Sequence, residues 1–383
     1  MGVVTSEIFE YAVKIRRELH MHPEVGFELY KTCELVKREL KSMGIPFTER
    51  FGKCSVVGYI GDNPKRKTLA LRADMDALPI QEKTNLPYAS TCEGKMHACA
   101  HDAHTANLLA TAKILKAREN ELSCNIRLIF QPSEEGEISG AKMMVDNGVM
   151  DGADRVIGIH SENTLDAGTI AVRPSEYMAA CIPINLRFFG KSAHATLANT
   201  GVDAIAMSVE AYLKLKGMVA EEAGETTPYI WSVGSFKGGQ VHNAIADFCE
   251  SKISFRFYDE GFALRVMKRA EEICNSIAEK FGGKAEVDWH ISARAVINDE
   301  ETVEMLRSAI EKEVPVKEDF KRMGSEDFCW YLTKASGAFF RFGTKNPASD
   351  KVTRPHNNDF VIDESGIRAA TTAFVLFALQ YGK

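Results

Sequence analysis

Residues 97–105 read HACAHDAHT and hold three histidines, one cysteine and one aspartate in nine positions. Three interpretations of this stretch are open: a metal site, a cysteine nucleophile with a histidine base, or the polar start of a histidine-rich helix. Cys99 lies two residues before His101, so a thiolate and an imidazole lie close together in the chain. Either of the first two interpretations needs further polar groups, which must come from elsewhere in the sequence.

Further carboxylates and histidines follow predicted strands. They are Asp74 and Asp76 after residues 68–73, Glu134 and Glu135 after residues 125–133, and His160 after residues 155–159, with His356 in the later loop RPHNNDF. Taken singly, each has an ordinary explanation as a solvated loop, a helix start or a buried histidine. Gathered at one sheet edge, they would form a nest of carboxylate, imidazole and thiolate that is costly unless cations neutralise it. Such a set suits borderline divalent ions, zinc first, with manganese, cobalt or nickel as alternatives.

The elements that must position these groups alternate between helix and strand in the first half of the chain. The predicted helices are 6–20, 30–43, 103–117 and 138–148, and the predicted strands are 55–61, 68–76, 125–133 and 155–161. This order predicts an α/β fold with a mostly parallel sheet that is covered on both faces. In such sheets ligands bind beyond the carboxyl ends of the strands, where the polar clusters lie.

The pattern changes after about residue 180. Strands are predicted at 181–190, 228–238, 247–258 and 284–292, and helices at 201–222 and 261–281. The order βαββαβ is that of the split ferredoxin-like unit, which is complete in itself. We therefore expect a discontinuous first domain, residues 1–180 and 294–383, interrupted by an inserted domain, residues 181–293.

Composition excludes several classes of protein. The net charge of −6 comes without a basic block that would indicate nucleic acid binding, and no apolar run approaches the ~20 residues of a membrane span. The first residues lack the features of a secretory signal. Nine scattered cysteines without a CxxC pair argue against a disulfide framework and for a reducing compartment, so we expect a cytoplasmic location.

Six motifs together resemble one family. They are RRELHMHPE at 16–24, ALRADMDALPIQE at 70–82, GKMHACAHDAHT at 94–105, FQPSEEG with GAKMM at 130–144, GSEDF at 324–328 and RPHNNDF at 354–360. They are similar to the amidohydrolase branch of the dinuclear-metal aminoacylase/carboxypeptidase superfamily, peptidase family M20. Hippurate hydrolases, N-acetyl-diaminopimelate deacetylases and auxin-conjugate hydrolases belong to that branch. The resemblance implies a metallohydrolase domain with an inserted lid and dimerisation domain.

The resemblance also implies roles for the residues at the sheet edge. Two divalent ions would be bridged by Cys99, and the further metal ligands would be His101, Glu135, His160 and His356. Glu134 would be the general base. Asp76 would orient one of the metal ligands without binding the metal itself. His104 and Asp102 are better explained as the start of a helix, and His97 has no assigned role.

The inserted domain carries three more candidates by the same resemblance. His194, in KSAHATLANTGVDAI, would stabilise the oxyanion of the tetrahedral intermediate, and in related enzymes this histidine comes from a partner subunit. Asn243 and Arg256 would bind the substrate. Arg256 would bind the carboxylate of the substrate, because a planar guanidinium suits a bidentate contact. A surface ion pair is the simpler alternative for Arg256.

Four positions depart from the family pattern. Ala100 stands where the family has glycine, Ala198-Asn199 replaces a Pro-His pair, Ala246 replaces a proline, and SENTLDAG after His160 lacks the expected prolines. None of them is a proposed ligand or the base, so they bear on substrate preference more than on reaction type.

The function predicted from these features is metal-dependent hydrolysis of the linear amide bond of N-acyl amino acids or similar small amides. A homo-oligomer, a dimer or tetramer formed through the lid, is expected, with no nucleic acid or membrane partner. The alternatives are a dipeptidase or carboxypeptidase of the same superfamily, a cysteine hydrolase that uses Cys99, and a binding protein that kept the fold without turnover.

Overall fold

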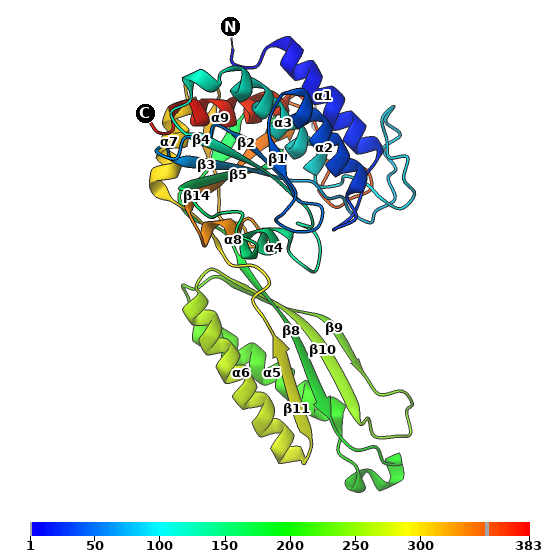
Figure 1. The fold of residues 1–383 in the computed structure, drawn as a ribbon. Coiled ribbons are helices and arrows are strands. Elements are labelled where there is room, and N and C mark those ends of the chain that lie inside the picture. Colours follow the sequence, from blue (N-terminus) through cyan, green and yellow to red (C-terminus); the bar gives the residue numbers. More distant parts are fainter. Residues whose placement is uncertain (1, 349–351) are drawn as a thin grey trace. The chain divides into compact units, whose positions relative to one another are not determined.

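The computed structural model describes residues 2–348 and 352–383, which fall into two compact units (Figure 1). The first unit comprises Met1–Tyr177, Ile297–Phe320 and Asp327–Lys383, and the second comprises Met178–Val296 and Lys321–Glu326. The predicted insert, residues 181–293, lies within the second unit. The short segment Lys321–Glu326, which comes much later in the chain, also belongs to that unit.

The first unit is built on an eight-stranded sheet in the order β1-β2-β4-β3-β5-β14-β6-β13. Its strands are β1 (Phe47–Thr48), β2 (Val56–Ile60), β3 (Thr68–Asp74), β4 (Asn125–Gln131), β5 (Arg155–Asp166), β6 (Ile170–Val172), β13 (Val316–Glu318) and β14 (Ser336–Lys345). The four central strands, β4, β3, β5 and β14, run parallel to one another, whereas β2 and β6 pair antiparallel with β4 and β14. The predicted mostly parallel sheet is thus confirmed. A separate pair consists of β7 (Ser175–Met178) and β12 (Val296–Asn298).

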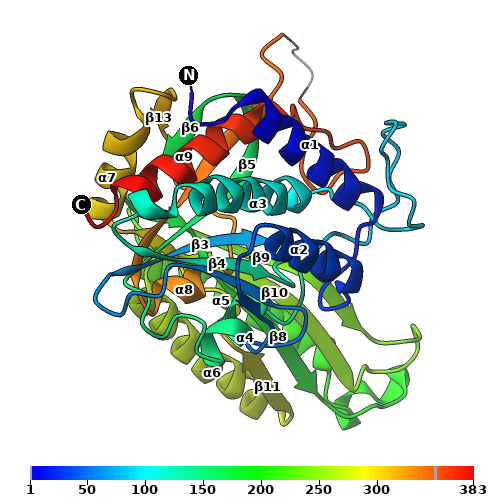
Figure 2. The same cartoon turned by 45° about the horizontal axis from the view of Figure 1, so that its top comes forward.

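Helices cover both faces of this sheet (Figures 1 and 2). One face carries α1 (Ser6–Met21), α2 (Tyr30–Ser42), α3 (His101–Ala117), α7 (Glu300–Ile310) and α9 (Gly366–Gln380), and the other carries α4 (Gly140–Asp146) and α8 (Cys329–Leu332). A short 3₁₀ helix, Glu119–Glu121, follows α3. Because α3 contacts α1, α9 and β3, it is buried along nearly its whole length.

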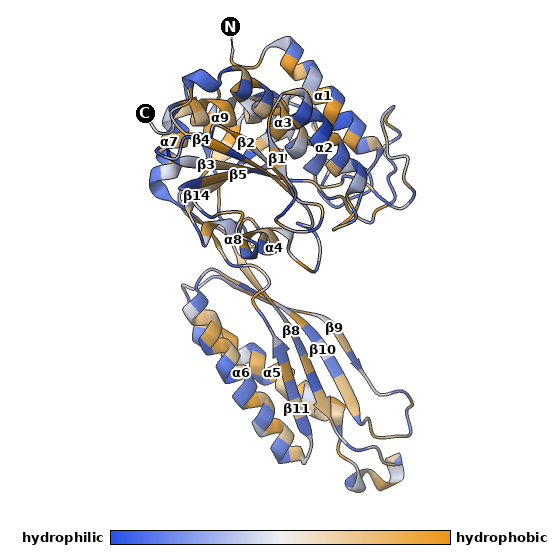
Figure 3. Cartoon of the chain, in the orientation of Figure 1, coloured by the Kyte–Doolittle hydropathy of each residue, from blue (hydrophilic) through white to orange (hydrophobic). Residues whose placement is uncertain are grey.

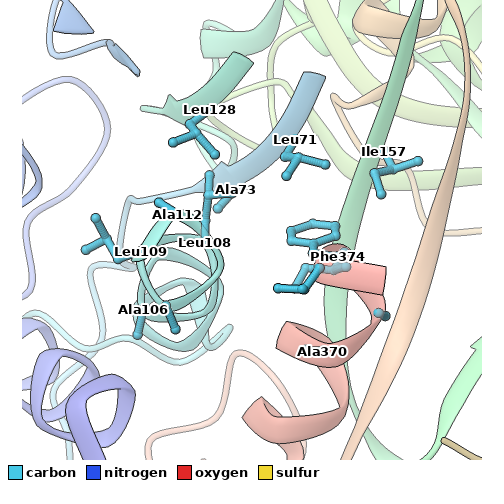
Figure 4. Close-up of a cluster of buried hydrophobic side chains, with 14 of the residues drawn as sticks. Leu71, Ala73, Ala106, Leu108, Leu109, Ala112, Leu128, Ile157, Ala370 and Phe374 are labelled. Atoms are coloured by element: carbon cyan, nitrogen blue, oxygen red, sulfur yellow. The ribbon is translucent and has the colours of Figure 1, made fainter. Parts of the chain in front are cut away.

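The core of the first unit lies between the central strands and helices α3 and α9 (Figure 4). Leu71 and Ala73 of β3 and Ile157 of β5 meet Leu108 of α3 and Phe374 of α9. The strand β3 is apolar almost throughout because both of its faces are covered, as is typical of a central parallel strand. This packing fixes where the strands end, and hence where the polar residues that follow them lie.

The second unit is a four-stranded antiparallel sheet in the order β11-β8-β10-β9. Its elements are β8 (Ala180–Phe189), a 3₁₀ helix (Ala195–Thr200), α5 (Ala204–Ala223), β9 (Tyr229–Gly238), β10 (Phe248–Phe257), α6 (Glu260–Phe281) and β11 (Lys284–Trp289). The predicted βαββαβ order is confirmed. Both helices bury an apolar stripe with β8 and β10, and Figure 3 shows hydrophilic and hydrophobic residues alternating around α6.

None of the helices in the described ranges combines the length and the hydrophobicity that crossing a bilayer requires.

Candidate metal centre

The polar clusters of the first unit meet at one edge of its sheet. Strands β3, β4 and β5 run parallel, so their carboxyl ends lie side by side and bring Asp76, Glu135 and His160 together. Cys99 precedes α3, which begins at His101 after a turn with Ala100 in the left-handed region at φ 65°.

His356 reaches the same edge from a distant loop. Its backbone N–H donates to the carbonyl oxygen of Ala98, 2.8 Å away, which places the loop beside Cys99. Its Nε2 lies 3.0 Å from Glu135 Oε1.

Two groups of potential metal ligands overlap at a single sulfur atom. The first is Cys99, His101 and His160, and the second is Cys99, Glu135 and His356. Within each group, one ligand atom per residue lies within 4.8 Å of the others. All five residues that the sequence predicted as ligands therefore gather around Cys99 Sγ. These residues would hold two divalent ions, with Cys99 belonging to both groups.

The ring nitrogens of His160 have distinct surroundings. Its Nδ1 lies 2.7 Å from the carbonyl oxygen of Ser161. A carbonyl oxygen can only accept, so Nδ1 carries the hydrogen and the lone pair of the ring is on Nε2. That Nε2 lies 3.3 Å from Cys99 Sγ. The lone pair of His160 therefore points at Cys99 Sγ.

Asp76 contacts both the histidine and the glutamates of the site. Its Oδ1 lies 3.3 Å from His101 Nδ1, and its two oxygens accept the backbone N–H groups of Glu134 and Glu135, each at 3.0 Å. With Nδ1 turned to Asp76, His101 Nε2 is buried and makes no hydrogen bond to another described residue. A buried histidine nitrogen without a hydrogen-bond partner suits a metal ligand, so the residues fit a metal.

Burial and neighbouring charges shift the pKa values of the ligands. Burial raises the pKa of the Cys99 thiol to about 12. Burial also lowers the pKa of His160 well below its ordinary value, and the adjacent Arg341 guanidinium lowers it further. Burial also lowers the pKa of His101, but the Asp74 carboxylate and the hydrogen bond with Asp76 outweigh this effect, so that the pKa of His101 is raised. A strong positive charge beside Cys99, such as a metal ion, would favour its thiolate form.

A buried network lies behind the ligands. Arg72 donates to Asp74 at 2.7 Å, and His104 Nδ1 lies 2.6 Å from the other oxygen of Asp74. His104 Nε2 accepts the backbone N–H of Ser161 at 2.9 Å, and Ser161 in turn accepts from His160. The sequence indicated only a helix start for His104, because nothing local predicts a contact with a residue 57 positions later.

Asp102 and His97 lie in the first turn of α3 and just before it. Asp102 accepts from Arg16 Nε at 2.8 Å and lies 2.7 Å from His20 Nδ1. Arg16 and His20 hold the pKa of Asp102 well below its usual range although burial raises it. His97 is buried, and neither ring nitrogen has a hydrogen-bond partner among the described residues. Burial lowers its pKa to about 3, so His97 is neutral.

The three remaining candidates lie in the second unit, at two different places. His194 pairs with Ala244 in an isolated antiparallel bridge, and Ala195 N donates to the Asn243 carbonyl at 2.9 Å, so His194 and Asn243 are neighbours. His194 is exposed, and its Nδ1 accepts the backbone N–H of Thr196 at 3.3 Å.

Arg256 lies near the other end of the sheet. It is opposite Cys181 at the start of β8, whereas the His194 loop follows Phe189 at the end of β8. Eight residues of extended strand separate the two places by roughly 27 Å. Arg256 Nη1 donates to the Met323 carbonyl and to Ser325 Oγ, both at 3.2 Å.

Comparison with known proteins agrees with this geometry. The model of "Peptidase family M20/M25/M40" matches residues 70–380. The chain is 33% identical to thermostable carboxypeptidase 1 of Saccharolobus solfataricus, over 98% of this chain and 96% of that protein. It is 35% identical to N-acetyl-L-cysteine deacetylase of Bacillus subtilis, over 96% and 87% of the two chains.

A solved structure extends the similarity to the whole fold. The Bacillus subtilis YxeP protein, described as a dinuclear metal binding peptidase from the M20 family, superposes with a TM-score of 0.85 at 29% identity. The match covers 98% of each chain. The resemblance seen in the six motifs is confirmed, and the chain belongs to peptidase family M20/M25/M40.

Proposed function

We propose that this protein is a metal-dependent amidohydrolase that cleaves the amide bond of N-acyl amino acids. The observation that carries this proposal is the pair of ligand groups that share Cys99. A deacetylase and a carboxypeptidase among the relatives both hydrolyse an amide next to an amino acid, which supports the same reaction class here.

Two divalent ions fit the donor atoms. Cys99 would bridge them, His101 and His160 would complete one position, and Glu135 and His356 the other. A set of thiolate, imidazole and carboxylate suits zinc, manganese, cobalt or nickel. When bound, such a pair polarises the amide carbonyl and lowers the pKa of a water molecule.

Glu134 is the proposed general base. Its backbone N–H is held by Asp76, and its carboxylate belongs with His101 and Glu135 to a third group of close donor atoms. Adjacent residues at a strand end point in different directions, so Glu135 can hold an ion while Glu134 takes the proton of the attacking water. The same carboxylic acid then protonates the leaving nitrogen.

The second unit is the proposed lid. His194 would donate a hydrogen bond to the oxyanion through Nε2, because its Nδ1 already accepts from Thr196. Asn243, its neighbour, would bind the substrate near the same place. Arg256 would bind the carboxylate of the amino acid. Because Arg256 and His194 are roughly 27 Å apart within one lid, a small substrate cannot touch both groups of one copy.

This separation supports an oligomer in which His194 serves the site of a partner subunit. The lid offers a surface for it. Apolar side chains are exposed on one face of α5, at Ile205, Val209 and Leu213, and at Phe236 on the edge strand β9. An open strand edge beside an apolar helix face favours pairing with a second copy. We propose a homodimer, or a tetramer built on it, through this surface.

A cytoplasmic location is proposed from the cysteines. All nine lie in the described part of the chain and are free, which suits a reducing compartment.

A carboxypeptidase is the second candidate, favoured by the 33% identity to the Saccharolobus enzyme. A cysteine hydrolase is less well supported. Cys99 Sγ does lie 3.3 Å from His160, but Cys99 is only 6% exposed, so an amide carbonyl has little access to its sulfur. A non-catalytic binding protein would have no need of Glu134 beside a complete ligand set.

The deciding experiment is a substrate panel with and without chelator. N-acetyl, N-benzoyl and longer N-acyl amino acids are compared with dipeptides, after addition of zinc, manganese or cobalt. We expect N-acyl amino acids to be hydrolysed and a chelator to abolish turnover. Preferential cleavage of dipeptides would favour the carboxypeptidase, and activity that survives metal removal would favour the cysteine hydrolase.

A further inference from the structure

The loop that carries His356 is closed at its base by one side chain. Thr353 Oγ1 donates to the Val361 carbonyl and accepts the Val361 N–H, both at 2.9 Å. Residues 353–361 thus form a closed loop with His356 inside it. Both ends of this loop are inside the protein, since Thr353 is 5% exposed and the adjoining Phe360 is 1% exposed.

Asn163 binds the base of this loop. Its Nδ2 donates to the Thr353 and Val361 carbonyls, each at 3.0 Å, and lies 3.2 Å from Thr353 Oγ1. Its Oδ1 accepts the hydroxyl of Thr344. Asn163 is itself only 5% exposed, so every polar group of its carboxamide is used in a buried setting. A buried amide held in this way fixes the segments that it joins.

Asn163 also connects this loop to the strand that carries His160. It stands in β5, three residues after His160, and Thr344 stands in the neighbouring strand β14. The carboxamide therefore joins the strand that supplies His160 to the loop that supplies His356.

The backbone of His356 gives an independent reason why the loop must be held. Its φ is 64°, in the left-handed region that non-glycine residues rarely adopt. Such a backbone conformation is unfavourable for a non-glycine residue and persists only where its surroundings enforce it. The hydrogen bond to Ala98 fixes His356 itself, and the base of the loop is fixed by Thr353 and Asn163.

We propose that Asn163 is a positioning residue for His356, and that through the loop 353–361 it sets the affinity of the metal position made by Cys99, Glu135 and His356. The position made by Cys99, His101 and His160 takes no ligand from this loop. The inference rests on the proposed dinuclear function, but it assigns to Asn163 a role in only one of the two positions.

The test uses the full-length Asn163→Ala variant and two measurements. Metal-free protein is titrated with Zn²⁺ by calorimetry, and amide hydrogen exchange is followed in the metal-free state. We expect one equivalent to bind as in the wild type and the second to bind 10–100-fold more weakly, the range seen when a group that orients a ligand is removed. Amides of residues 353–361 should exchange at least ~10-fold faster, while those of 101–117 stay unchanged.

Thr164→Ala is the matched control. Thr164 is the next residue of β5, is exposed, and its hydroxyl donates to Glu162 rather than to the loop 353–361. It should leave both measurements unchanged. Should Asn163→Ala not fold, Thr344→Val removes the hydroxyl that holds Asn163 Oδ1 and should give the same pattern more weakly.

The outcomes are separable. If both equivalents weaken equally, or if neither measurement changes, Asn163 does not position His356 and the inference is wrong. If the wild type binds fewer than two equivalents, the proposed dinuclear function fails. In that case faster exchange confined to 353–361 still supports the loop contact, and unchanged exchange overturns it.

Discussion

Asp76 Oδ1 lies 3.3 Å from His101 Nδ1, and the same carboxylate accepts the backbone N–H groups of both glutamates of the site. One side chain therefore contacts the proposed ligand His101 and holds the strand end that carries the proposed base. Asp76→Asn keeps the shape but turns an N–H₂ group toward at least one donor. We expect metal affinity to fall 10–100-fold. Calorimetric titration of metal-free protein measures this, with the exposed Asp62→Asn as control. An unchanged metal affinity of Asp76→Asn would show that Asp76 does not orient a metal ligand.

Glu134 and Glu135 are the same residue type in different proposed roles, so matched substitutions can separate them. Glu134→Gln removes the basic group and should lower kcat at least about 10²-fold, with metal content kept. Glu135→Gln should instead weaken one metal, and added metal should restore part of its activity. Metal analysis and steady-state rates of both variants are measured side by side. Near-normal turnover of Glu134→Gln would mean that the roles are misassigned.

His194 is expected to act on the oxyanion and not on the metals. His194→Ala should lower kcat about 10²-fold or more and leave metal content unchanged. The exposed His290→Ala in the same unit is the control. Loss of metal along with activity would make His194 a ligand.

Mixing two inactive variants tests whether His194 serves a partner's site. Dimers that contain one Glu134→Gln chain and one His194→Ala chain have one site with both groups intact. After exchange of subunits, activity should recover to at most roughly a quarter of the wild type. No recovery, in a mixture shown to exchange, would place His194 at the site of its own chain.

The apolar face of α5 is expected to be an interface between copies. Leu213→Glu places a charge in it and should shift the molar mass measured by light scattering toward the monomer. Leu264→Glu changes another exposed leucine, on α6, and should leave the mass unchanged. If Leu264→Glu alone dissociates the protein, the interface lies on the other helix.

His20 should make stability depend on pH. Burial alone lowers its pKa, but Asp102, 2.7 Å from Nδ1, and Glu82, 3.4 Å from Nε2, raise it above the ordinary value, against the opposing charge of Arg16. Protonated His20 therefore stabilises the fold fully below about pH 6.5, and this contribution is lost as the pH rises through the higher folded pKa. The neighbouring His97 stays neutral in this range.

The measurement is thermal unfolding of wild type and His20→Asn between pH 5 and 9. The difference in melting temperature should be largest below about pH 6.5 and should shrink at higher pH. A difference that is constant across this range would show that His20 does not titrate in the fold.

Local patterns were enough to predict the architecture. The apolar run of β3 reflects burial on both faces, the strict alternation in β10 reflects burial on one face, and the helical spacing of apolar residues in α6 reflects burial of one stripe. Each pattern is visible within the segment itself, so it can be predicted from local sequence. The position of Asp76 and Glu135 just after strands also follows from the chain alone, because parallel strands bring their carboxyl ends together. The motifs then identified which residue types could bind metal.

The pairing of those residues was decided by the tertiary structure. That Cys99 belongs to two ligand groups, that Asn163 holds the loop of His356, and that His194 and Arg256 lie at opposite ends of one sheet are contacts or separations between segments far apart in sequence. Such relations depend on strand register and on loop conformations, such as the left-handed backbone conformation of His356. Neither produces a periodic pattern in the sequence. Residue types could therefore be read from the chain, but which atoms face one another could not, because that is set by the packing of the whole unit.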